Sequence, residues 1–304
     1  WTATDLCGND IVHTQTITVQ DTTDPAFVEA LPADATVECD AVPTAVTLTA
    51  TDNCGTATVT FNETSTEVAG ACANYTITRT WTATDLCGND IVHTQTITVQ
   101  DTTDPAFVEA LPADATVECD AVPTAVTLTA TDNCGTATVT FNETSTEVAG
   151  ACANYTITRT WTATDLCGND IVHTQTITVQ DTTDPAFVEA LPADATVECD
   201  AVPAAVTLTA TDNCGTATVT FNETSTEVAG ACANYTITRT WTATDLCGND
   251  IVHTQTITVQ DTTDPAFVEA LPADATVECD AVPAAVTLTA TDNCGTATVT
   301  FNET

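Results

Sequence analysis

The sequence contains no lysine and no methionine, and only three arginines stand against 43 aspartates and glutamates. The formal net charge of −40 at pH 7 excludes nucleic acid as a partner, because phosphates repel a surface of that sign. Aromatic residues make up only 5% of the chain, and no stretch shows the apolar spacing of an amphipathic helix. A helical fold is therefore excluded, while 43% apolar residues argue against disorder.

What is present is an internal repeat. Residues 81–160 copy residues 1–80, and the copies differ only where Thr44 and Thr124 become Ala204 and Ala284. Near-identical copies of this kind indicate a tandem array. Because the sequence starts and stops inside a repeat, we expect a window from a longer protein, with any signal peptide, anchor or functional tip elsewhere.

Apolar side chains alternate with threonine throughout each repeat. In YTITRTWTATD, the residues Tyr75, Ile77, Arg79, Trp81 and Ala83 share one face, and threonines fill the other. The stretches AVTLTATD, ATVTFNE and DIVHTQTITVQ alternate in the same way. Half-buried strands of this kind, separated by turn signals, predict an antiparallel, immunoglobulin-like β-sandwich of roughly seven strands in each repeat, with the repeats in a linear array.

The motif QDTTDPAF supplies the boundary between domains, because Asp24 and Pro25 favour an extended, unpaired segment. The expected domains are a C-terminal fragment at 1–20, complete repeats at 21–100, 101–180 and 181–260, and an N-terminal part at 261–304. Within the first complete repeat, we expect strands A, B and C at 28–38, 45–51 and 56–63, strand D or E near 65–68, and strands F and G at 75–84 and 91–99.

Four cysteines recur in each repeat, which points to an oxidising, extracellular compartment. In the expected topology the B–C and F–G loops share the top of the sandwich, and the A–B and E–F loops share the bottom. This arrangement selects pairing within each repeat, with loops of about 34 residues worth roughly 3–4 kcal/mol each. The predicted disulfides are Cys39–Cys72, Cys54–Cys87, Cys119–Cys152, Cys134–Cys167, Cys199–Cys232 and Cys214–Cys247.

This pairing leaves Cys7, Cys279 and Cys294 without partners. Local pairing of Cys39 with Cys54 would instead join Cys279 to Cys294 and leave only Cys7. A zinc or redox site is disfavoured, because no CxxC pair and no Cys/His ligand spacing occurs.

Carboxylates gather beside the expected top of each repeat. Without lysine they would repel one another, and Ca²⁺, which takes six to eight oxygen ligands, would remove that repulsion. The alternative is plain turn chemistry, since Asp and Asn favour turns and no EF-hand or nonapeptide signature is present. The predicted ligands are Asp24, Asp52, Asp85, Asn89 and Asp90, and in the next repeat Asp104, Asp132, Asp165, Asn169 and Asp170. We also expect an acidic junction, in which Glu38 and Asp40 face Asp101, Asp104, Asp132, Asp165 and Asp170 at the top of the next repeat.

Arg79 is the one charged residue on the inward face of strand F. It is predicted to act as a structural clasp that stacks on Trp81 and pairs with Glu38, Glu63 or Glu67. The alternative is an arginine whose stem packs while its head reaches water. Trp81 is interpreted as a core residue rather than a sugar platform.

The motifs TATDNCG, RTWTATDLCGN and TQTITVQDTTDP resemble the hyalin-repeat type of immunoglobulin-like module. The resemblance is strongest to the form arrayed in giant surface adhesins of gliding, Bacteroidetes-type bacteria, and it covers every copy. It implies export to the cell surface and a stalk or adhesive role. It also implies O-glycosylation in the DTT motif, at Thr22, Thr102, Thr182 and Thr262.

These observations favour the stalk or filament of an extracellular adhesin, stiffened by calcium between domains. A multivalent glycan-binding module is the alternative, but it would need clusters of exposed aromatic residues. No catalytic motif is present, and His93 is interpreted as a strand residue because no nucleophile accompanies it, so we do not expect an enzyme. The expected partners are neighbouring repeats, identical chains in a fibre, and a surface or glycan target bound by a tip outside this window.

Overall fold

The computed structural model describes residues 1–231 and 234–303. These residues form two compact units, and the middle repeat contributes to both of them. The first unit comprises 1–112, 126–142 and 159–174, and the second comprises 113–125, 143–158 and 175–304. Their regular structure is β-strand apart from three short 3₁₀ turns, so the predicted all-β class is confirmed.

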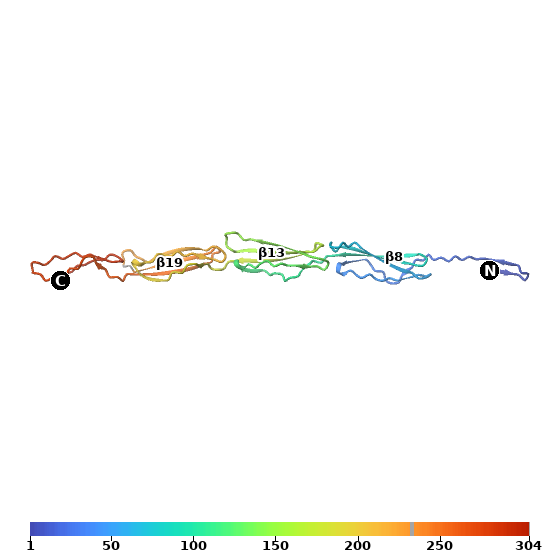
Figure 1. Cartoon of the computed structure of the whole chain (residues 1–304), viewed down its shortest axis with the longest axis horizontal. Coiled ribbons are helices and arrows are strands. Elements are labelled where there is room, and N and C mark those ends of the chain that lie inside the picture. The colour runs from blue at the N-terminus through green and yellow to red at the C-terminus, as the bar shows by residue number, and fades with distance from the viewer. Residues whose placement is uncertain (232–233, 304) are drawn as a thin grey trace. The chain divides into compact units, whose positions relative to one another are not determined.

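The first complete repeat shows the architecture of the sandwich. Its main sheet has the strand order β4-β8-β7-β6, in which β4 runs parallel to β8 and the other pairs are antiparallel. A separate two-stranded ribbon pairs β3 with β5. The strands are β3 (Ala26–Phe27), β4 (Ala35–Glu38), β5 (Ala50–Thr51), β6 (Thr58–Ser65), β7 (Tyr75–Thr84) and β8 (Asp90–Gln100), the last labelled in Figure 1.

The same elements recur along the chain, and β13 and β19 mark the next two repeats in Figure 1. The 3₁₀ turns lie at Cys39–Ala41, Cys119–Ala121 and Cys199–Ala201. The second set is β9 (Ala106–Phe107), β10 (Ala115–Glu118), β11 (Ala130–Thr131), β12 (Thr138–Ser145), β13 (Tyr155–Thr164) and β14 (Asp170–Gln180). The third is β15 (Ala186–Phe187), β16 (Ala195–Glu198), β17 (Ala210–Thr211), β18 (Thr218–Ser225), β19 (Tyr235–Thr244) and β20 (Asp250–Gln260). The terminal pairs are β1 (Thr2–Thr4) with β2 (Asp10–Val12), and β21 (Ala266–Phe267) with β22 (Ala290–Thr291).

Three expected strands differ in the structure. The predicted strand A at 28–38 is reduced to β4, with the short β3 preceding it, and strand B is reduced to β5. Pro32 lies in the unpaired part of the predicted strand A, where its missing N–H group prevents ladder pairing. No strand D or E forms at 66–68, because Thr66 N donates to Thr76 O at 3.0 Å and joins β6 directly to β7 as a hairpin.

The core lies on the inward face that the alternation predicts. Ile77, Trp81 and Ala83 from β7 are buried, and so are Ile97 and Val99 from β8. Burial of one such aliphatic side chain contributes about 1.5–3 kcal/mol. Polar residues share this face, which raises the question of what satisfies their hydrogen bonds.

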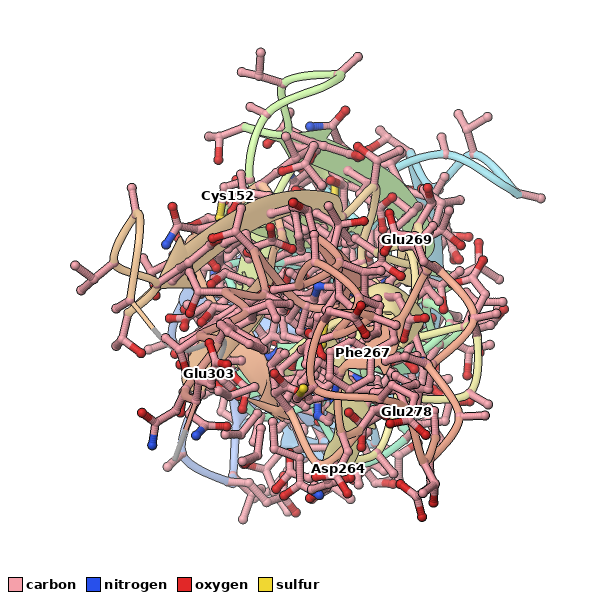
Figure 2. The ribbon with its side chains drawn as sticks, turned by 90° about the vertical axis from the view of Figure 1, so that its left-hand side faces the viewer. Cys152, Asp264, Phe267, Glu269, Glu278 and Glu303 are labelled. Atoms are coloured by element: carbon pink, nitrogen blue, oxygen red, sulfur yellow. A yellow bond between two sulfur atoms is a disulfide. The ribbon has the colours of Figure 1, made fainter. Side chains whose placement is uncertain are left out.

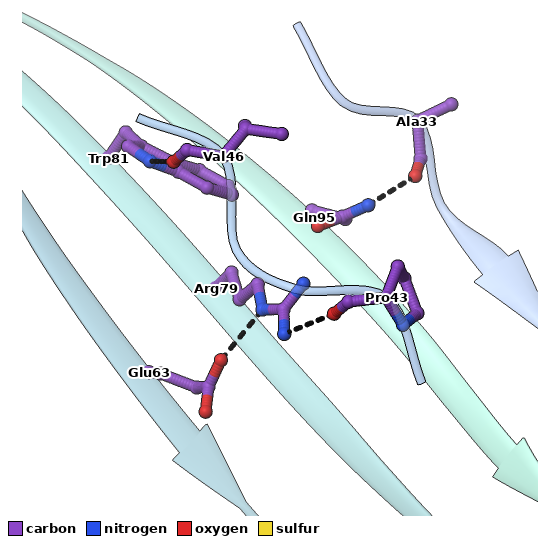
Figure 3. A network of polar contacts seen from close by, with 7 residues as sticks. All are labelled: Ala33, Pro43, Val46, Glu63, Arg79, Trp81 and Gln95. Atoms are coloured by element: carbon purple, nitrogen blue, oxygen red, sulfur yellow. Dashed lines mark hydrogen bonds and ion pairs between the residues drawn. The ribbon is translucent and has the colours of Figure 1, made fainter. Parts of the chain in front are cut away.

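Irregular segments of the backbone cover the sheet and accept those hydrogen bonds (Figure 3). Trp81 Nε1 donates to Val46 O at 3.1 Å, and an Arg79 terminal nitrogen donates to Pro43 O at 2.8 Å. Of the three glutamates expected to pair with Arg79, the structure uses Glu63, whose Oε2 lies 2.7 Å from Arg79 Nε. Carbonyl groups that have no strand partner are thus paired by side chains of the sheet.

The 28–34 segment is held by β8 in the same way. His93 Nε2 lies 2.9 Å from Pro32 O, and Gln95 Nε2 donates to Ala33 O at 2.7 Å. Thr96 N donates to Asp34 Oδ1 at 2.7 Å. The second layer of the sandwich therefore depends on specific polar side chains as well as on apolar packing.

Candidate functional site

Every disulfide in the described structure connects one repeat to the next. Each joins two cysteines that are 95 residues apart, at Cα–Cα distances of 4.5 to 5.7 Å. In the first unit the bonds are Cys39–Cys134 and Cys72–Cys167. In the second unit they are Cys119–Cys214, Cys152–Cys247 and Cys199–Cys294.

The predicted pairing within repeats is therefore wrong for the described cysteines. Cys39 and Cys72 do lie at one end of their repeat, but they bond to the next repeat rather than to each other. The same holds for Cys119 and Cys152, and it removes the predicted pairs of Cys134 with Cys167 and of Cys214 with Cys247. Cys54 and Cys87 are free, and Cys199 bonds to Cys294. Its expected partner, Cys232, lies outside the described residues.

The alternative of local pairing is also not formed, because Cys279 is a free thiol. The physical reason for the pairing between repeats is the orientation of the repeat ends that carry the cysteines. The cysteines at the base of one repeat face the cysteines at the top of the next, within the Cα separation that a disulfide requires. We call this region, with the acids described below, the junction.

Acidic side chains converge at the junction in the first unit. Carboxylate oxygens of Asp101, Asp132 and Asp165 lie within 4.8 Å of one another. Glu38 from the preceding repeat approaches Asp101 and the Cys134 sulfur within the same limit. In the second unit, Glu118, Asp181 and Cys214 are grouped in the same way. The acids of two successive repeats therefore share one site beside a disulfide.

Asp101 lies at the centre of this cluster because β8 leads directly into it. Its N–H donates to Asn74 Oδ1 at 2.9 Å, and its carbonyl accepts from Asn169 Nδ2 at 3.2 Å. Only 6% of the residue is exposed. Burial raises the pKa of the Asp101 carboxyl, and the negative charges of Asp132 and Asp165 raise it further. Asp181 shows the same rise in pKa, from its own burial and from Asp212 and Asp245.

Asp165 is held differently, by the turn between β13 and β14. Its Oδ1 accepts from the N–H groups of Cys167, Gly168 and Asn169 at 2.7 to 2.9 Å, and its Oδ2 accepts from Asn169 Nδ2 at 2.8 Å. Gly168 permits the turn by its φ of 92°. Burial raises the pKa of Asp165, but these hydrogen bonds outweigh burial and hold it below its ordinary value. This carboxylate is thus kept ionised at the edge of the cluster.

Asp132 carries an oxygen atom whose environment fits a cation. Its Oδ2 accepts from Cys134 N at 2.7 Å, whereas its Oδ1 is buried and has no hydrogen-bond partner. Asp212 Oδ2 is in the same situation in the second unit. Buried polar atoms are normally paired, and a group of carboxylate oxygens is the donor set that calcium prefers. The residues present therefore fit a bound divalent cation.

The structure brings together part of the predicted ligand set. Asp52 and Asp85 lie in one cluster, and Asp132 and Asp165 lie in the next. Asn89 and Asn169 contact the clusters but donate their amide N–H groups to Asp85 and Asp165 rather than presenting oxygen. The remaining four predicted ligands are exposed: Asp24, Asp90, Asp104 and Asp170.

The predicted ligand list leaves out the first aspartate of the DTTDP motif, although Asp101 is among the acids expected at the junction. Asp21 completes the cluster with Asp52 and Asp85, and Asp101 completes the next one. A signal for this choice was available, because this aspartate directly follows strand G and is therefore carried to the top of the next repeat.

The threonines expected to be glycosylated also take part in the junction. Thr102 donates from Oγ1 to Glu38 Oε1 at 2.6 Å and from N to Glu38 Oε2 at 3.1 Å. Thr182 contacts Glu118 and Thr262 contacts Glu198 through the same atoms. Thr22 is exposed, and glycosylation of these residues stays a prediction.

At the top of the first complete repeat, the same group of acids is present but is not covered by the base of another repeat. Asp21, Asp52 and Asp85 are grouped there, beside the free Cys54 and Cys87. Leu86 is 78% exposed, whereas Leu166 at the covered top is 48% exposed. Partial desolvation raises the pKa of both thiols, and the charge of Asp21 raises it further. Docking of one repeat on the next thus covers an apolar side chain together with the acids.

Carboxylates also cover other parts of the surface. Figure 2 labels Asp264, Glu269, Glu278 and Glu303 near the C-terminus, and all four side chains are exposed. Among the described residues, no helix is long and apolar enough to span a membrane.

Comparison with solved structures finds extracellular cadherin repeats. The extracellular domain of protocadherin gamma B4 is 16% identical, with a TM-score of 0.36, and the match covers 87% of this chain and 53% of that one. Mouse cadherin-23 EC22-24 is 14% identical, with a TM-score of 0.35, and the match covers 78% and 98%. The chain thus spans about half the length of the protocadherin. At these scores the likeness carries no argument about function.

No curated protein matches the sequence. A family model does match, and it describes an HYR-like domain with four cysteines. It covers residues 27–99, 107–179 and 187–259, which together are more than half of the chain and include four cysteines in each match. The chain therefore belongs to the family of HYR-like domains with four cysteines.

Proposed function

We propose that this chain is a structural stalk segment of a repetitive extracellular surface protein, in which successive sandwich domains are locked end to end. The observation that carries this proposal is the pair of disulfides between neighbouring repeats. A disulfide inside a domain stabilises that domain, whereas these bonds fix one domain to another. Disulfides also persist in oxidising, extracellular compartments. The adhesin of a Bacteroidetes-type cell surface is the context that the motifs favour.

The composition of the repeat supports a structural role over a catalytic one. Near-identical copies supply length, and each junction reproduces the same disulfides and the same acids. The high negative charge keeps such an array soluble. The partners in this proposal are neighbouring repeats, other copies of the chain in a fibre, and a target held by a separate tip.

Calcium at the junction is the second part of the proposal. Glu38, Asp101, Asp132 and Asp165 would hold the ion, and the unpaired Asp132 Oδ1 is the atom that most needs it. The ion would neutralise acids contributed by two repeats and so would stiffen their connection. Because the ion would bind to folded repeats and not to unfolded ones, it would raise the stability of the repeats by mass action.

Glycan binding is the weaker alternative. Trp81, Trp161 and Trp241 are each 1% exposed, so these indole rings are not available as sugar platforms. A glycan array incubated with the fluorescently labelled chain would test this alternative, which stays a prediction.

Calcium titration of the full chain tests the metal site. The Asp132→Asn variant relieves repulsion in chelator and removes a ligand in calcium, so it is expected to melt above the parent in chelator and below it in calcium. Asp104→Asn is the matched control, because Asp104 is exposed, and it should show no such reversal. Identical responses of the two variants would remove calcium from the proposal.

The stalk itself is tested by small-angle scattering from the oxidised chain. The proposal expects an elongated particle whose maximum dimension rises when further copies of the repeat are added. A compact particle would overturn the stalk, irrespective of the result with calcium.

A further inference from the structure

The spacing of the disulfides has a mechanical consequence that goes beyond a stalk. Cys134 is bonded to Cys39 of the preceding repeat. Cys119 lies in the same repeat as Cys134 and is bonded to Cys214 of the following repeat. A covalent path therefore enters each repeat at its top and leaves at its base through a short stretch of backbone, here 119–134. The next step runs from Cys214 back to Cys199 and on to Cys294, through the equivalent stretch 199–214.

A second path of the same kind runs beside the first. Cys72 bonds to Cys167, and Cys152, which precedes Cys167 by the same short interval, bonds to Cys247. The first path uses the segment that contains β11, and the second uses the one that contains β13, an inner strand of its sheet. Each complete junction therefore has two disulfides in addition to the continuous backbone.

We propose that these two disulfide paths act as a covalent tether that limits how far the array can extend under tension, even when its domains unfold. The continuous backbone from Cys39 to Cys294 would reach roughly 870 Å when fully extended. The shortest covalent path between the same two residues contains only the segments 119–134 and 199–214. It reaches roughly 120 Å including its three disulfides.

The tether leaves little slack in a folded repeat. A strand of 11 residues such as β8 spans about 36 Å, and the segment 119–134 at full extension reaches about 50 Å. Forced unfolding of one repeat would therefore release roughly 15 Å, whereas a repeat without these bonds would release more than about 200 Å. The covalent bonds thus carry a pulling force before the unfolded repeat has extended far.

The inferred function is mechanical: a tether under tension outside the cell. The tether depends on the cysteine connectivity alone, not on calcium or on the identity of an adhesive target. A result that contradicts the tether can therefore be distinguished from a result that contradicts the calcium site and from one that contradicts the stalk.

Single-molecule force spectroscopy on the full oxidised chain, held at both termini, tests the tether. The double variant Cys134→Ser/Cys167→Ser opens both bonds of the first junction, so the path from residue 39 to residue 119 must follow the whole intervening backbone. The expected gain in maximum extension is about 65 residues, or roughly 220 Å. The matched control is Cys54→Ser/Cys87→Ser, which changes the same two positions one repeat earlier, where both thiols are free, and should gain nothing.

The measurement does not require a folded variant, because maximum extension in denaturant is set by the covalent path. A gain of roughly 220 Å in the first variant only, together with full-length extension of the parent after reduction by a phosphine, supports the tether. Equal maximum extension of the two variants, as pairing within repeats predicts, overturns it. So does full-length extension of the oxidised parent.

Discussion

The indole Nε1 of Trp81 donates a hydrogen bond to the carbonyl oxygen of Val46 at 3.1 Å. This bond connects a fully buried side chain of the sheet to a covering segment that has no ladder partner of its own. Trp161 and Trp241 make the same bond to Val126 and Val206. One indole group in each of these repeats therefore helps to hold the second layer in place.

Replacing Trp81, Trp161 and Trp241 together by phenylalanine should lower the free energy of unfolding by about 1–3 kcal/mol per repeat, because the core loses aromatic volume and a part-buried hydrogen bond. Urea unfolding followed by circular dichroism measures the change. Trp1→Phe is the matched control, since Trp1 occupies the same position in the repeat pattern but is 75% exposed. A comparable loss in the control would show that the hydrogen bond is not the cause.

The buried arginine makes a second prediction. Arg79→Met with Arg239→Met should cost about 1–3 kcal/mol per repeat, since each change removes the bonds of a buried guanidinium to a proline carbonyl and to a glutamate. Glu63→Gln with Glu223→Gln should cost less than about 1 kcal/mol, because these glutamates are partly exposed and glutamine still accepts from Nε. Thermal unfolding of both variants measures the difference, and equal losses would contradict the clasp.

Thiol labelling provides a direct measurement of the cysteine connectivity. The denatured, oxidised chain should take up at least four alkyl groups, at Cys7, Cys54, Cys87 and Cys279. Pairing within repeats would leave only three thiols, and local pairing only one. Intact mass spectrometry counts the groups. In the native chain, the raised pKa values of Cys54 and Cys87 should make alkylation slower than after denaturation.

The acid dependence of stability should come in part from Glu29 and its equivalents. Hydrogen bonds from the N–H and hydroxyl groups of Thr49 hold the pKa of Glu29 below its ordinary value of 4.5. A carboxyl whose pKa is lowered by folding stabilises the protein above its unfolded pKa, and this contribution is lost as the pH falls through the folded value.

The variant with glutamine in place of Glu29, Glu109, Glu189 and Glu269 should therefore lose less stability than the parent as the pH falls below 4.5. Melting temperatures measured across this range test the prediction. Parallel curves for parent and variant would show that these carboxyls do not contribute.

The sequence predicted the elements of the sheet well, because alternation is a local property. Trp81 and Ile97 are buried on the faces that the alternation indicates. The covering layer was harder to predict, because its position depends on side-chain donors such as Gln95, which no periodicity reveals. Prolines in the same segments were the available sign that regular pairing would fail there.

The disulfide pairing could not be read from the sequence, and the reason is the repeat itself. Cys54 and Cys134 have the same local sequence, so any rule that brings Cys39 near one describes the other equally well. Pairing within repeats assumes that each repeat is a closed unit. The expectation that Glu38 faces the top of the next repeat is the better guide, since Cys39 follows Glu38 directly.

The sequence separation of 95 residues in each disulfide also sets an order of events during synthesis. The thiol of Cys72 must stay reduced until Cys167 has been made, and at about 5–20 residues per second this takes roughly 5 to 20 s. Cys39 likewise has no partner until Cys134 has been made. The cysteines at the base of each newly made repeat therefore wait for the next repeat before they are cross-linked, and the array closes from its N-terminal end, one repeat behind the growing chain.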